Sequence, residues 1–391
     1  MNFVYLLIEF LDELVFGAQG ALMPLLQTDF HLNYIQIGLL FSLPGYMSLL
    51  IEPILGILAD VWKRRFLILG GGVILAISLV LTSVAQVFYL LLFAFIIFAP
   101  ASGAFVSLTQ STWMDADPDR RDHNMACWTF AGSIGVVLGP LALGAALTIG
   151  LGWRGLQLVL AALTVVAVIF AFRYLHPPLP AENIPPFPTF QSFLDGLRSA
   201  FSALRKPDVI RWILLLEFSD LMLDTLLAFL ALYFVNIVGL SPQVAALAVA
   251  VWTGVGLLGD FLLIPLLERV SGLAYLRVSV IIELILFPAF LLVPTLVFKL
   301  ILLALLGFFN SGWYAILKAE QYKSIHGQSG LVLVLDNLGA LLGKSIPLAI
   351  GFIAESYGLG LAMWVLLAGP IALFFGLPRH NLAANTDKLE P

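Results

Sequence analysis

Charged residues are scarce in this chain. Asp, Glu, Lys and Arg together make up 11% of its 391 residues, whereas apolar residues make up 61%, and the mean hydropathy is +1.03. So few charges cannot cover the surface of a soluble protein of this size. The sequence therefore indicates a protein whose surface faces lipid over much of its area.

Cysteine and histidine are also rare. The single cysteine, Cys127, excludes an internal disulfide and a cysteine-based metal cluster, and the five histidines show no metal-ligand spacing. The net charge of −5 is small and the basic residues cluster in expected loops, which argues against a nucleic-acid partner. No nucleophile can be paired with a base, so we expect neither an enzyme nor a bound metal or cofactor.

Apolar runs long enough to cross a bilayer recur along the whole chain. A transmembrane helix needs about 20 apolar residues, and short polar breaks separate twelve such runs. The predicted fold class is therefore an all-α membrane protein with twelve transmembrane helices. The expected spans are 3–26, 35–58, 66–86, 88–113, 124–148 and 153–174 in the first half, and 210–234, 243–266, 275–297, 299–321, 330–354 and 358–377 in the second.

Lys and Arg are unevenly divided between the two ends of these spans. With the N-terminus in the cytoplasm, fifteen fall on the cytoplasmic side and two, Arg154 and Lys299, fall outside, while Lys318 and Lys344 lie within spans. Positive charge near span ends is retained in the cytoplasm. The start of the chain also lacks the basic region and cleavage site of a secretory signal. We therefore predict a multi-pass protein of the cell inner membrane with both termini cytoplasmic and Met1 retained.

The longest polar segment separates the two halves. It covers residues 175–208 and opens with six prolines, after which apolar residues recur at helical spacing from 190 to 204. The prolines favour an extended spacer, and the later stretch is typical of an amphipathic helix on the membrane surface. The predicted division is a six-helix bundle at 1–174, this cytoplasmic linker at 175–208, a second six-helix bundle at 209–378 and a cytoplasmic tail at 379–391.

An internal repeat relates the two halves. A shift of 208 residues superimposes acidic positions of the first half on acidic positions of the second, and later in the chain a shift of 204 superimposes glycines. Two parallel six-helix repeats are a known plan of secondary transporters. The coinciding pairs are Glu9 with Glu217, Asp12 with Asp220, Glu52 with Asp260, Asp60 with Glu268, Gly135 with Gly339 and Gly139 with Gly343.

Residues 56–65 resemble a loop signature of the major facilitator superfamily. They read Gly-Ile-Leu-Ala-Asp-Val-Trp-Lys-Arg-Arg, against Gly-x-x-x-Asp-Arg-x-Gly-Arg-Arg in the family, and they depart from it at Val61 and Lys63. The resemblance implies the major facilitator fold and a loop that latches the cytoplasmic side while the transporter is open outward. The alternative is a plain anchor of positive charge. The candidate gating residues are Gly56, Asp60, Lys63, Arg64 and Arg65 and, one or two helical turns deeper in the membrane, Glu52 and Asp260.

The fifth expected span carries glycines at four-residue spacing and a proline. Gly135, Gly139 and Pro140 resemble a Gly-Pro signature described chiefly for antiporters of the superfamily that export drugs. Small residues let helices cross closely, and proline bends a helix. The resemblance implies export and adds these three residues to the gating candidates. Ordinary close packing explains the same pattern and is the alternative.

Acidic residues within the spans are the main candidates for function. Residues three and four apart share one side of a helix, and the first and seventh expected helices each carry three acids at that spacing. In the fold that the resemblance implies, both helices line the central cavity. Charge at membrane depth persists mostly where it faces water, a partner or a substrate. We predict that these acids bind protons or a cationic substrate: Glu9, Asp12 and Glu13, and Glu217, Asp220 and Asp224.

Lys344, on the eleventh expected span, is the base assigned to the same site. It either pairs with a buried acid, such as Asp336 eight residues earlier, or binds an anionic group of a substrate. Pairing of acids with Lys318 or Lys344 would give some of those acids a purely structural role. Glu283, in the middle of the ninth span, has no role that the sequence assigns.

These observations favour a secondary active transporter. We predict proton-coupled export of small amphipathic or cationic molecules by alternating access, similar to the drug and proton antiporters of the superfamily. The protein is expected to act as a monomer, with a small-molecule substrate, protons and the lipid bilayer as its partners. The alternatives are a proton-coupled uptake symporter, an exporter of lipid-like or metal-ion substrates and, from a different class, a membrane receptor or scaffold that transports nothing.

Overall fold

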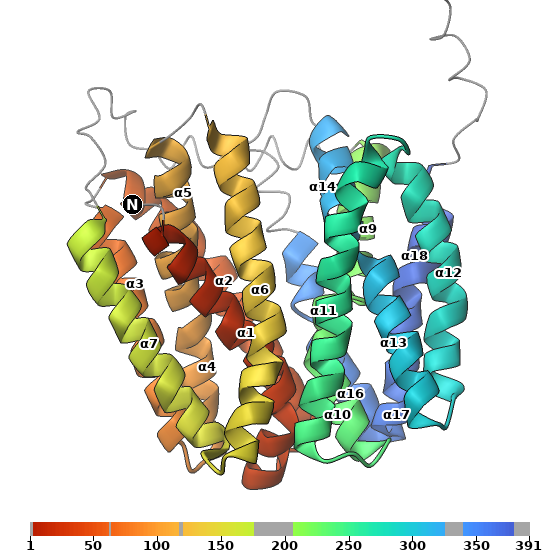
Figure 1. The fold of residues 1–391 in the computed structure, drawn as a ribbon, viewed down its shortest axis with the longest axis horizontal. Helices are drawn as coiled ribbons and strands as arrows, with labels where there is room; N and C mark the ends of the chain where they lie inside the picture. Colours follow the sequence, from red (N-terminus) through yellow and green to blue (C-terminus); the bar gives the residue numbers. More distant parts are fainter. Residues whose placement is uncertain (1–2, 62–63, 117–119, 176–205, 325–338, 379–391) are drawn as a thin grey trace, which may run out of the picture.

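The computed structural model describes residues 3–61, 64–116, 120–175, 206–324 and 339–378. Within these ranges the chain is helical and contains no strand. Two helical bundles lie side by side, one on each side of the linker in sequence (Figure 1). The amphipathic helix expected at 190–204 lies outside the described residues. The end of the molecule at which residues 175 and 206 lie is called the linker end below, and the opposite end the far end.

Six spans form the first bundle, and each expected span of this half is confirmed to within a few residues. The fourth span is α-helical at both ends and has one π-helical turn between them. The elements are α1 (Phe3–Phe30), α2 (Tyr34–Val61), α3 (Arg64–Val84), α4 (Phe88–Ser102) with η1 (Gly103–Ser107) and α5 (Leu108–Ala116), α6 (Arg121–Thr148) and α7 (Gly152–Tyr174).

The second bundle also consists of six spans, and several of them contain more than one helix. The eleventh span is described from residue 339 onward. The elements are α9 (Pro207–Asp220) with α10 (Asp224–Asn236), α11 (Pro242–Leu267), α12 (Gly272–Leu292), α13 (Leu296–Asn310) with α14 (Trp313–Ser324), α16 (Ile346–Tyr357), and α17 (Leu359–Ala362) with η3 (Met363–Leu367) and α18 (Ala368–Gly376).

Nine helical stretches in the described part of the chain are long and apolar enough to cross a bilayer. The other three expected spans are α1, the pair α9 and α10, and the eleventh span. These three carry the intramembrane acids of the predicted site and Lys344. The seventh span is divided into two helices that are each shorter than a full span, and the eleventh is described only from residue 339, whereas α1 is one long helix that carries three acids, which are costly in lipid.

The seventh and tenth spans are interrupted where the sequence predicted continuous helices. Residues 221–223 form a turn whose N–H groups bond to carbonyls three residues earlier. The tenth span breaks at Ser311 and Gly312, where Gly312 has a φ of 71° that favours glycine. The side chain of Asn310 donates a 3.0 Å hydrogen bond to the carbonyl of Met222. The two breaks are therefore held together inside the second bundle.

Glycines let α1 and α6 pack backbone against backbone. A Cβ atom on Gly17 would lie 2.4 Å from the carbonyl oxygen of Val136, and one on Gly139 would lie 2.4 Å from the nitrogen of Ala18. Any larger residue would force the two helices apart. Close packing is thus sufficient to explain Gly135 and Gly139, and the gating role of these glycines and of Pro140 stays a prediction.

The two bundles contact each other at the far end. A Cβ atom on Gly351 of α16 would lie 2.4 Å from the carbonyl oxygen of Tyr34, and one on Gly38 of α2 would lie 2.8 Å from Leu348. The N–H of Tyr34 donates a 2.9 Å hydrogen bond to the carboxylate of Glu355. Glu355 therefore caps the N-terminus of α2 from the other bundle, a position that favours negative charge. The far end is closed in this state.

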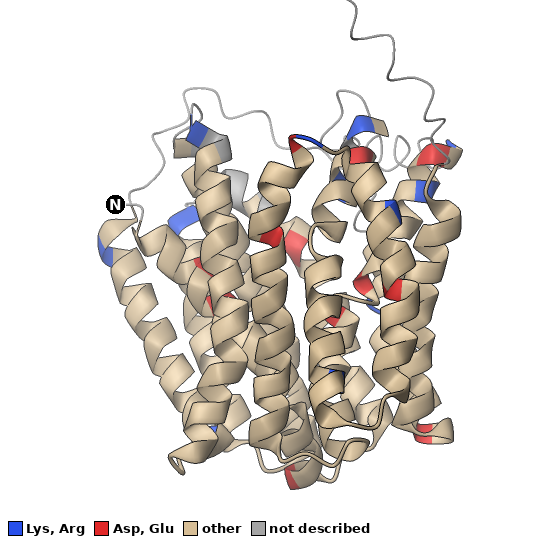
Figure 2. Cartoon of the chain, turned by 45° about the vertical axis from the view of Figure 1, so that its right-hand side comes forward, with Lys and Arg blue, Asp and Glu red and all other residues tan. Residues whose placement is uncertain are grey.

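Lys and Arg gather mainly at the linker end (Figure 2). Lys299, the first residue of the expected tenth span, lies in the first turn of α13 and is 3% exposed. Its Nζ donates to the hydroxyl of Tyr233 at 2.8 Å and to the carbonyl of Phe290 near the end of α12. The boundaries of these two spans differ from the prediction, because α12 ends at Leu292, before Pro294, and α13 begins at Leu296. Lysine at this position bonds a carbonyl in the last turn of α12.

Candidate functional site

A cavity of about 1720 Å³ lies between the two bundles. Helices α1, α2, α4 and α6 line it from the first bundle, and α10, α11, α13 and α14 with Lys344 line it from the second. The lining reaches Leu267, the last residue of α11 at the linker end, whereas the bundles meet at the far end. The cavity is therefore open toward the linker end.

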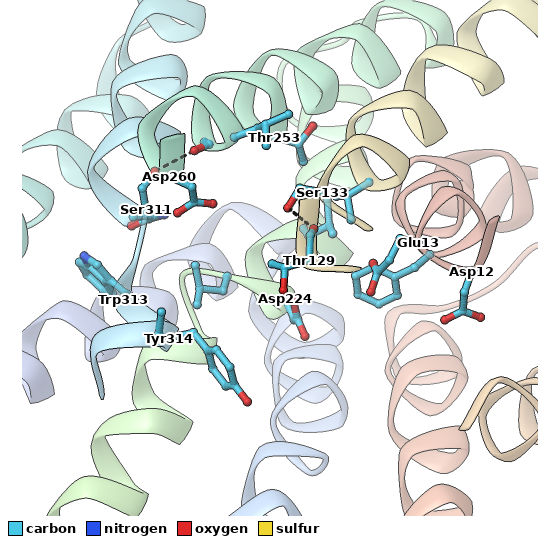
Figure 3. Close-up of a pocket in the computed structure, with 18 of the residues that line it drawn as sticks. Asp12, Glu13, Thr129, Ser133, Asp224, Thr253, Asp260, Ser311, Trp313 and Tyr314 are labelled. Atoms are coloured by element: carbon cyan, nitrogen blue, oxygen red, sulfur yellow. Dashed lines mark hydrogen bonds between the residues drawn. The ribbon is translucent and has the colours of Figure 1, made fainter. Parts of the chain in front are cut away.

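Asp12 and Glu13 of α1 lie at the cavity on the side of the first bundle (Figure 3). Ser102 donates a 2.9 Å hydrogen bond to Oδ2 of Asp12. The other oxygen, Oδ1, is buried and has no hydrogen-bond partner among the residues described. Glu13 interacts electrostatically with Asp12, with Glu9 and, across the cavity, with Asp224. Acids of both bundles therefore meet at this point.

Asp224 is the first residue of α10, directly after the break of the seventh span. The N-terminus of a helix favours negative charge, so the break creates a position suited to a carboxylate at the cavity surface. Lys344 interacts electrostatically with Asp224, with Asp220 and with Glu52 of the first bundle. The structure thus places Lys344 among acids of both bundles, while its other expected partner, Asp336, lies outside the described residues.

Glu52 and Asp260, which the repeat relates, line the cavity from α2 and α11. Asp260 accepts a 2.9 Å hydrogen bond from the N–H of Gly312 at the break of the tenth span. An oxygen of Glu52 lies 2.7 Å from where a Cβ atom on Gly103 would be, at the start of the π-helical turn of the fourth span. Each acid therefore lies against an irregular turn, and such turns are frequent at functional sites.

The cavity lining does not include Glu9, Glu217 or Asp220, although the sequence assigned them to the site. Glu9 is 7% exposed and accepts a hydrogen bond from the indole of Trp128. Glu217 packs on the eleventh span, where a Cβ atom on Gly343 would lie 2.1 Å from its carboxylate. The structure brings Asp12, Glu13, Asp224 and Lys344 together at the cavity and places the other three acids behind it.

Several polar residues of the lining were not predicted from the sequence. Serine and threonine are common in apolar helices because their hydroxyls bond to the preceding turn, so they carry little signal. The break of the tenth span could have been predicted, since Asn-Ser-Gly at 310–312 is a turn sequence inside an apolar run. The polar lining residues without a prediction are Gln19, Ser48, Ser102, Thr129, Ser133, Thr253, Asn310 and Ser311.

The loop signature at 56–65 lies at the linker end. Gly56 and Asp60 belong to the last turns of α2, and Arg64 begins α3, while Lys63 lies outside the described residues. The guanidinium of Arg65 lies 5.1 Å from the ring centroid of Phe172 in α7 and donates to the carbonyl of that residue. Arg65 thus ties α3 to α7, and the latch role of Asp60 stays a prediction.

Two six-helix bundles, closed together at one end around a cavity with acids at membrane depth, define a membrane transporter. Residues 5–343 match the Major Facilitator Superfamily, and the chain belongs to this superfamily. The predicted twelve-helix fold is therefore confirmed, and the protein is a transporter rather than an enzyme. The match covers the first bundle from residue 5 and the second bundle as far as Gly343 in the eleventh span.

Among individual proteins, the chain is similar to a probable sugar efflux transporter of Helicobacter acinonychis (strain Sheeba). The two are 25% identical over 263 residues, which are 66% of this chain and 64% of the relative's length. The fold is similar to a bacterial homologue of the human lysosomal transporter Spinster in an inward-facing and occupied conformation, with a TM-score of 0.72, 18% identity and coverage of 96% and 93% of the two chains. It is also similar to the nucleoside transporter NupG, with a TM-score of 0.72, 16% identity and coverage of 96% and 98%.

Proposed function

We propose that this transporter exports small amphipathic or cationic molecules in exchange for protons. The observation that carries the proposal is the charge of the cavity, where the described lining contains five acids and one base. A cleft of one sign with apolar walls concentrates ions of the opposite sign. Aromatic rings, including Trp252 and Tyr314, add apolar surface and cation–π contacts. The lining acids are Asp12, Glu13, Glu52, Asp224 and Asp260, and the base is Lys344.

The direction of opening supports transport by alternating access. If the linker end is cytoplasmic, as the division of basic residues predicts, the state described here is open to the cytoplasm. The opposite state requires the contacts between α2 and α16 at the far end to separate and the linker end to close. Rocking of two repeats about a central site is the usual mechanism of such folds.

Competition for carboxylates supports exchange with protons. Asp12, Glu13 and Asp224 lie in one cavity yet belong to both bundles. A carboxyl group binds a cation only after it has lost its own proton, so a proton and a cationic substrate exclude each other at one group. Substrate affinity is therefore expected to rise with pH in the range where these groups lose their protons.

A second candidate function is sugar export, which the similarity to the probable sugar efflux transporter favours. A neutral sugar would bind through hydrogen bonds to the same acids and through contact with aromatic rings. The two functions can be separated by thermal-shift measurements on the purified protein with tetraphenylphosphonium and with mono- and disaccharides. Stabilisation by the cation that increases from about pH 6 to about pH 8 supports the first proposal, whereas stabilisation by sugars alone would replace it with the second.

The orientation can be tested with single cysteines. In a Cys127→Ser background, Ser271→Cys lies in an exposed loop at the linker end and Thr295→Cys in an exposed loop at the far end. An impermeant maleimide is expected to label Thr295→Cys in intact cells and Ser271→Cys only after the membrane is opened. Labelling of Ser271→Cys from outside would contradict cytoplasmic termini.

The latch prediction concerns Asp60. Asp60→Asn is expected to weaken the state that is closed at the linker end and to slow turnover, because its carboxylate would face a helix N-terminus in that state. Expression should stay near normal. Its repeat partner is the control, since the loop after Glu268 keeps little of the signature. If Glu268→Gln slows proteoliposome transport as much as Asp60→Asn does, the latch is not confined to the first bundle.

A further inference from the structure

Glu283 is a buried acid that the cavity does not use. It lies midway along α12, its side chain is 0% exposed, and neither carboxyl oxygen has a hydrogen-bond partner among the residues that the structure describes. An unpaired carboxylate is far more costly to bury than a neutral carboxylic acid. Burial without a hydrogen-bond partner therefore favours the neutral, protonated form of Glu283 in this state.

The face of α12 that holds Glu283 contacts the break of the tenth span. Tyr275, Ser279 and Glu283 recur every four residues and so lie on one face. The indole of Trp313 donates a 2.9 Å hydrogen bond to the hydroxyl of Ser279. The hydroxyl of Tyr275 donates a 3.1 Å bond to the carbonyl of Ser311. Residues on both sides of the break are thus bonded to the row that ends at Glu283.

The other side of the same break faces the cavity. Asp260 accepts its hydrogen bond from Gly312 there, and Ser311, Gly312 and Trp313 also belong to the cavity lining (Figure 3). Tyr275 interacts electrostatically with both Asp260 and Glu283. The break therefore lies between an acid of the cavity and an acid of the bundle interior.

The other ionisable groups on the helices that pack against α12 either bond to other residues or follow Trp313 along α14 toward the linker end. Helices α13, α14 and α18 and the short helix η3 pack against α12, and neither α18 nor η3 contains an ionisable residue. Lys299 of α13 is bonded toward the far end to Tyr233 and to the carbonyl of Phe290. The ionisable residues of α14 follow its first residue, Trp313, toward the linker end: Tyr314, Lys318, Glu320, Tyr322 and Lys323.

We propose that Glu283 is a proton-binding site inside the second bundle, whose occupancy is coupled to the break between α13 and α14 and through it to Asp260. In the state open at the linker end, Asp260 holds Gly312 and Glu283 keeps its proton in a dry site. Closure at the linker end moves the first turn of α14, which borders the cavity. This change admits water to the row on α12, and the proton leaves the carboxyl group of Glu283 for water.

This inference deepens the proposed exchange with protons and rests on it, but the protonation of Glu283 can be measured without any substrate. Infrared difference spectra of the purified full chain report the C=O stretch of a protonated carboxyl group. A band present in the wild type and lost in Glu283→Gln is expected. The glutamine keeps the shape of the neutral acid, so the variant should fold. Glu13→Gln, which changes a cavity acid, is the control and should leave the Glu283 band in place.

The coupling between the proton on Glu283 and the conformational state is tested in a variant that favours the opposite state. Gly351→Trp has no room in the contact between α2 and α16 and favours the state open at the far end. At the same pH, the Glu283 band is expected to fall by about half or more in this background. No Glu283 band, or one equal in the two backgrounds, would overturn the inference. If Glu283→Gln does not fold, Glu283→Asp should shift the band, and an unshifted band would also overturn the inference.

Failure of the proposed function gives a different result. A protein that moves substrate without moving protons, yet shows a Glu283 band that depends on the conformational state, would refute proton exchange and support the coupled site. A protein that exchanges protons but shows a Glu283 band independent of the conformational state would support proton exchange and refute the coupled site.

Discussion

Asp224→Asn is expected to reduce transport of a cationic substrate about tenfold or more at neutral pH, with expression and thermal stability at least equal to wild type. Asp224 begins α10 at the cavity surface and interacts with Glu13 and Lys344. Asparagine keeps the shape and removes the charge. A charge-assisted hydrogen bond contributes about 1.5–3 kcal/mol, which corresponds to a loss of about ten- to a hundredfold. Removing the charge also removes its desolvation cost, which is why folding should not suffer.

The dependence on pH separates a binding role from a structural one. Wild-type affinity for the cation is expected to rise between about pH 6 and about pH 8, and Asp224→Asn should flatten this rise because asparagine has no proton to lose. Asp12→Asn and Glu13→Gln should also flatten the rise of affinity with pH. Asp220→Asn is the matched control, since Asp220 lies one turn earlier on the same span but not in the cavity lining.

Two outcomes would contradict this assignment. Wild-type transport and unchanged pH dependence in all three lining variants would exclude these acids as the site. A purely structural acid paired with Lys344 would behave differently, because its neutralisation would leave a lysine without its partner and destabilise the protein by roughly 3–5 kcal/mol. Thermal unfolding measured beside transport distinguishes the cases, since transport would then fall only in proportion to the folded protein.

Gly351→Trp is expected to abolish transport while the protein stays folded and shifts to the state open at the far end. A Cβ atom at this position would already lie 2.4 Å from the carbonyl oxygen of Tyr34, so an indole cannot fit while α2 and α16 are in contact. Separation of the bundles relieves the clash without disturbing the interior of either. The far-end contact is therefore the part of the structure on which this substitution acts.

Cysteine reactivity measures this shift. Leu348→Cys in a Cys127→Ser background lies at the contact with Gly38 and should react slowly, then much faster when Gly351→Trp is added. Gly70→Trp is the control, because nothing lies within 4 Å of a Cβ atom there. Glu355→Gln should shift the equilibrium in the same direction by less, because it weakens a single hydrogen bond. Unchanged reactivity at Leu348→Cys in the Gly351→Trp protein would show that this contact does not control the far end.

Local pattern was enough to predict the spans and to place the acids within them. The grouping of Asp12 with Glu13 on one side of α1 follows from helical spacing alone. The break after Asp220 could not be predicted, because residues 213–236 contain neither glycine nor proline. The structure shows that Asn310, almost ninety residues later in the chain, bonds to Met222 within that break. A side chain so distant in sequence leaves no local signal.

The sequence by itself determined that this is a twelve-span membrane protein with two related halves, since hydropathy and the repeat are properties of the chain read in order. It also predicted which acids lie within the spans. Only the tertiary structure decided which of them share a cavity. Asp12, Asp224 and Lys344 come from three spans distant in sequence, whereas Glu283 is enclosed within one bundle. The physical reason is that helix packing sets which side of each span faces water, and packing depends on contacts that residue spacing does not encode.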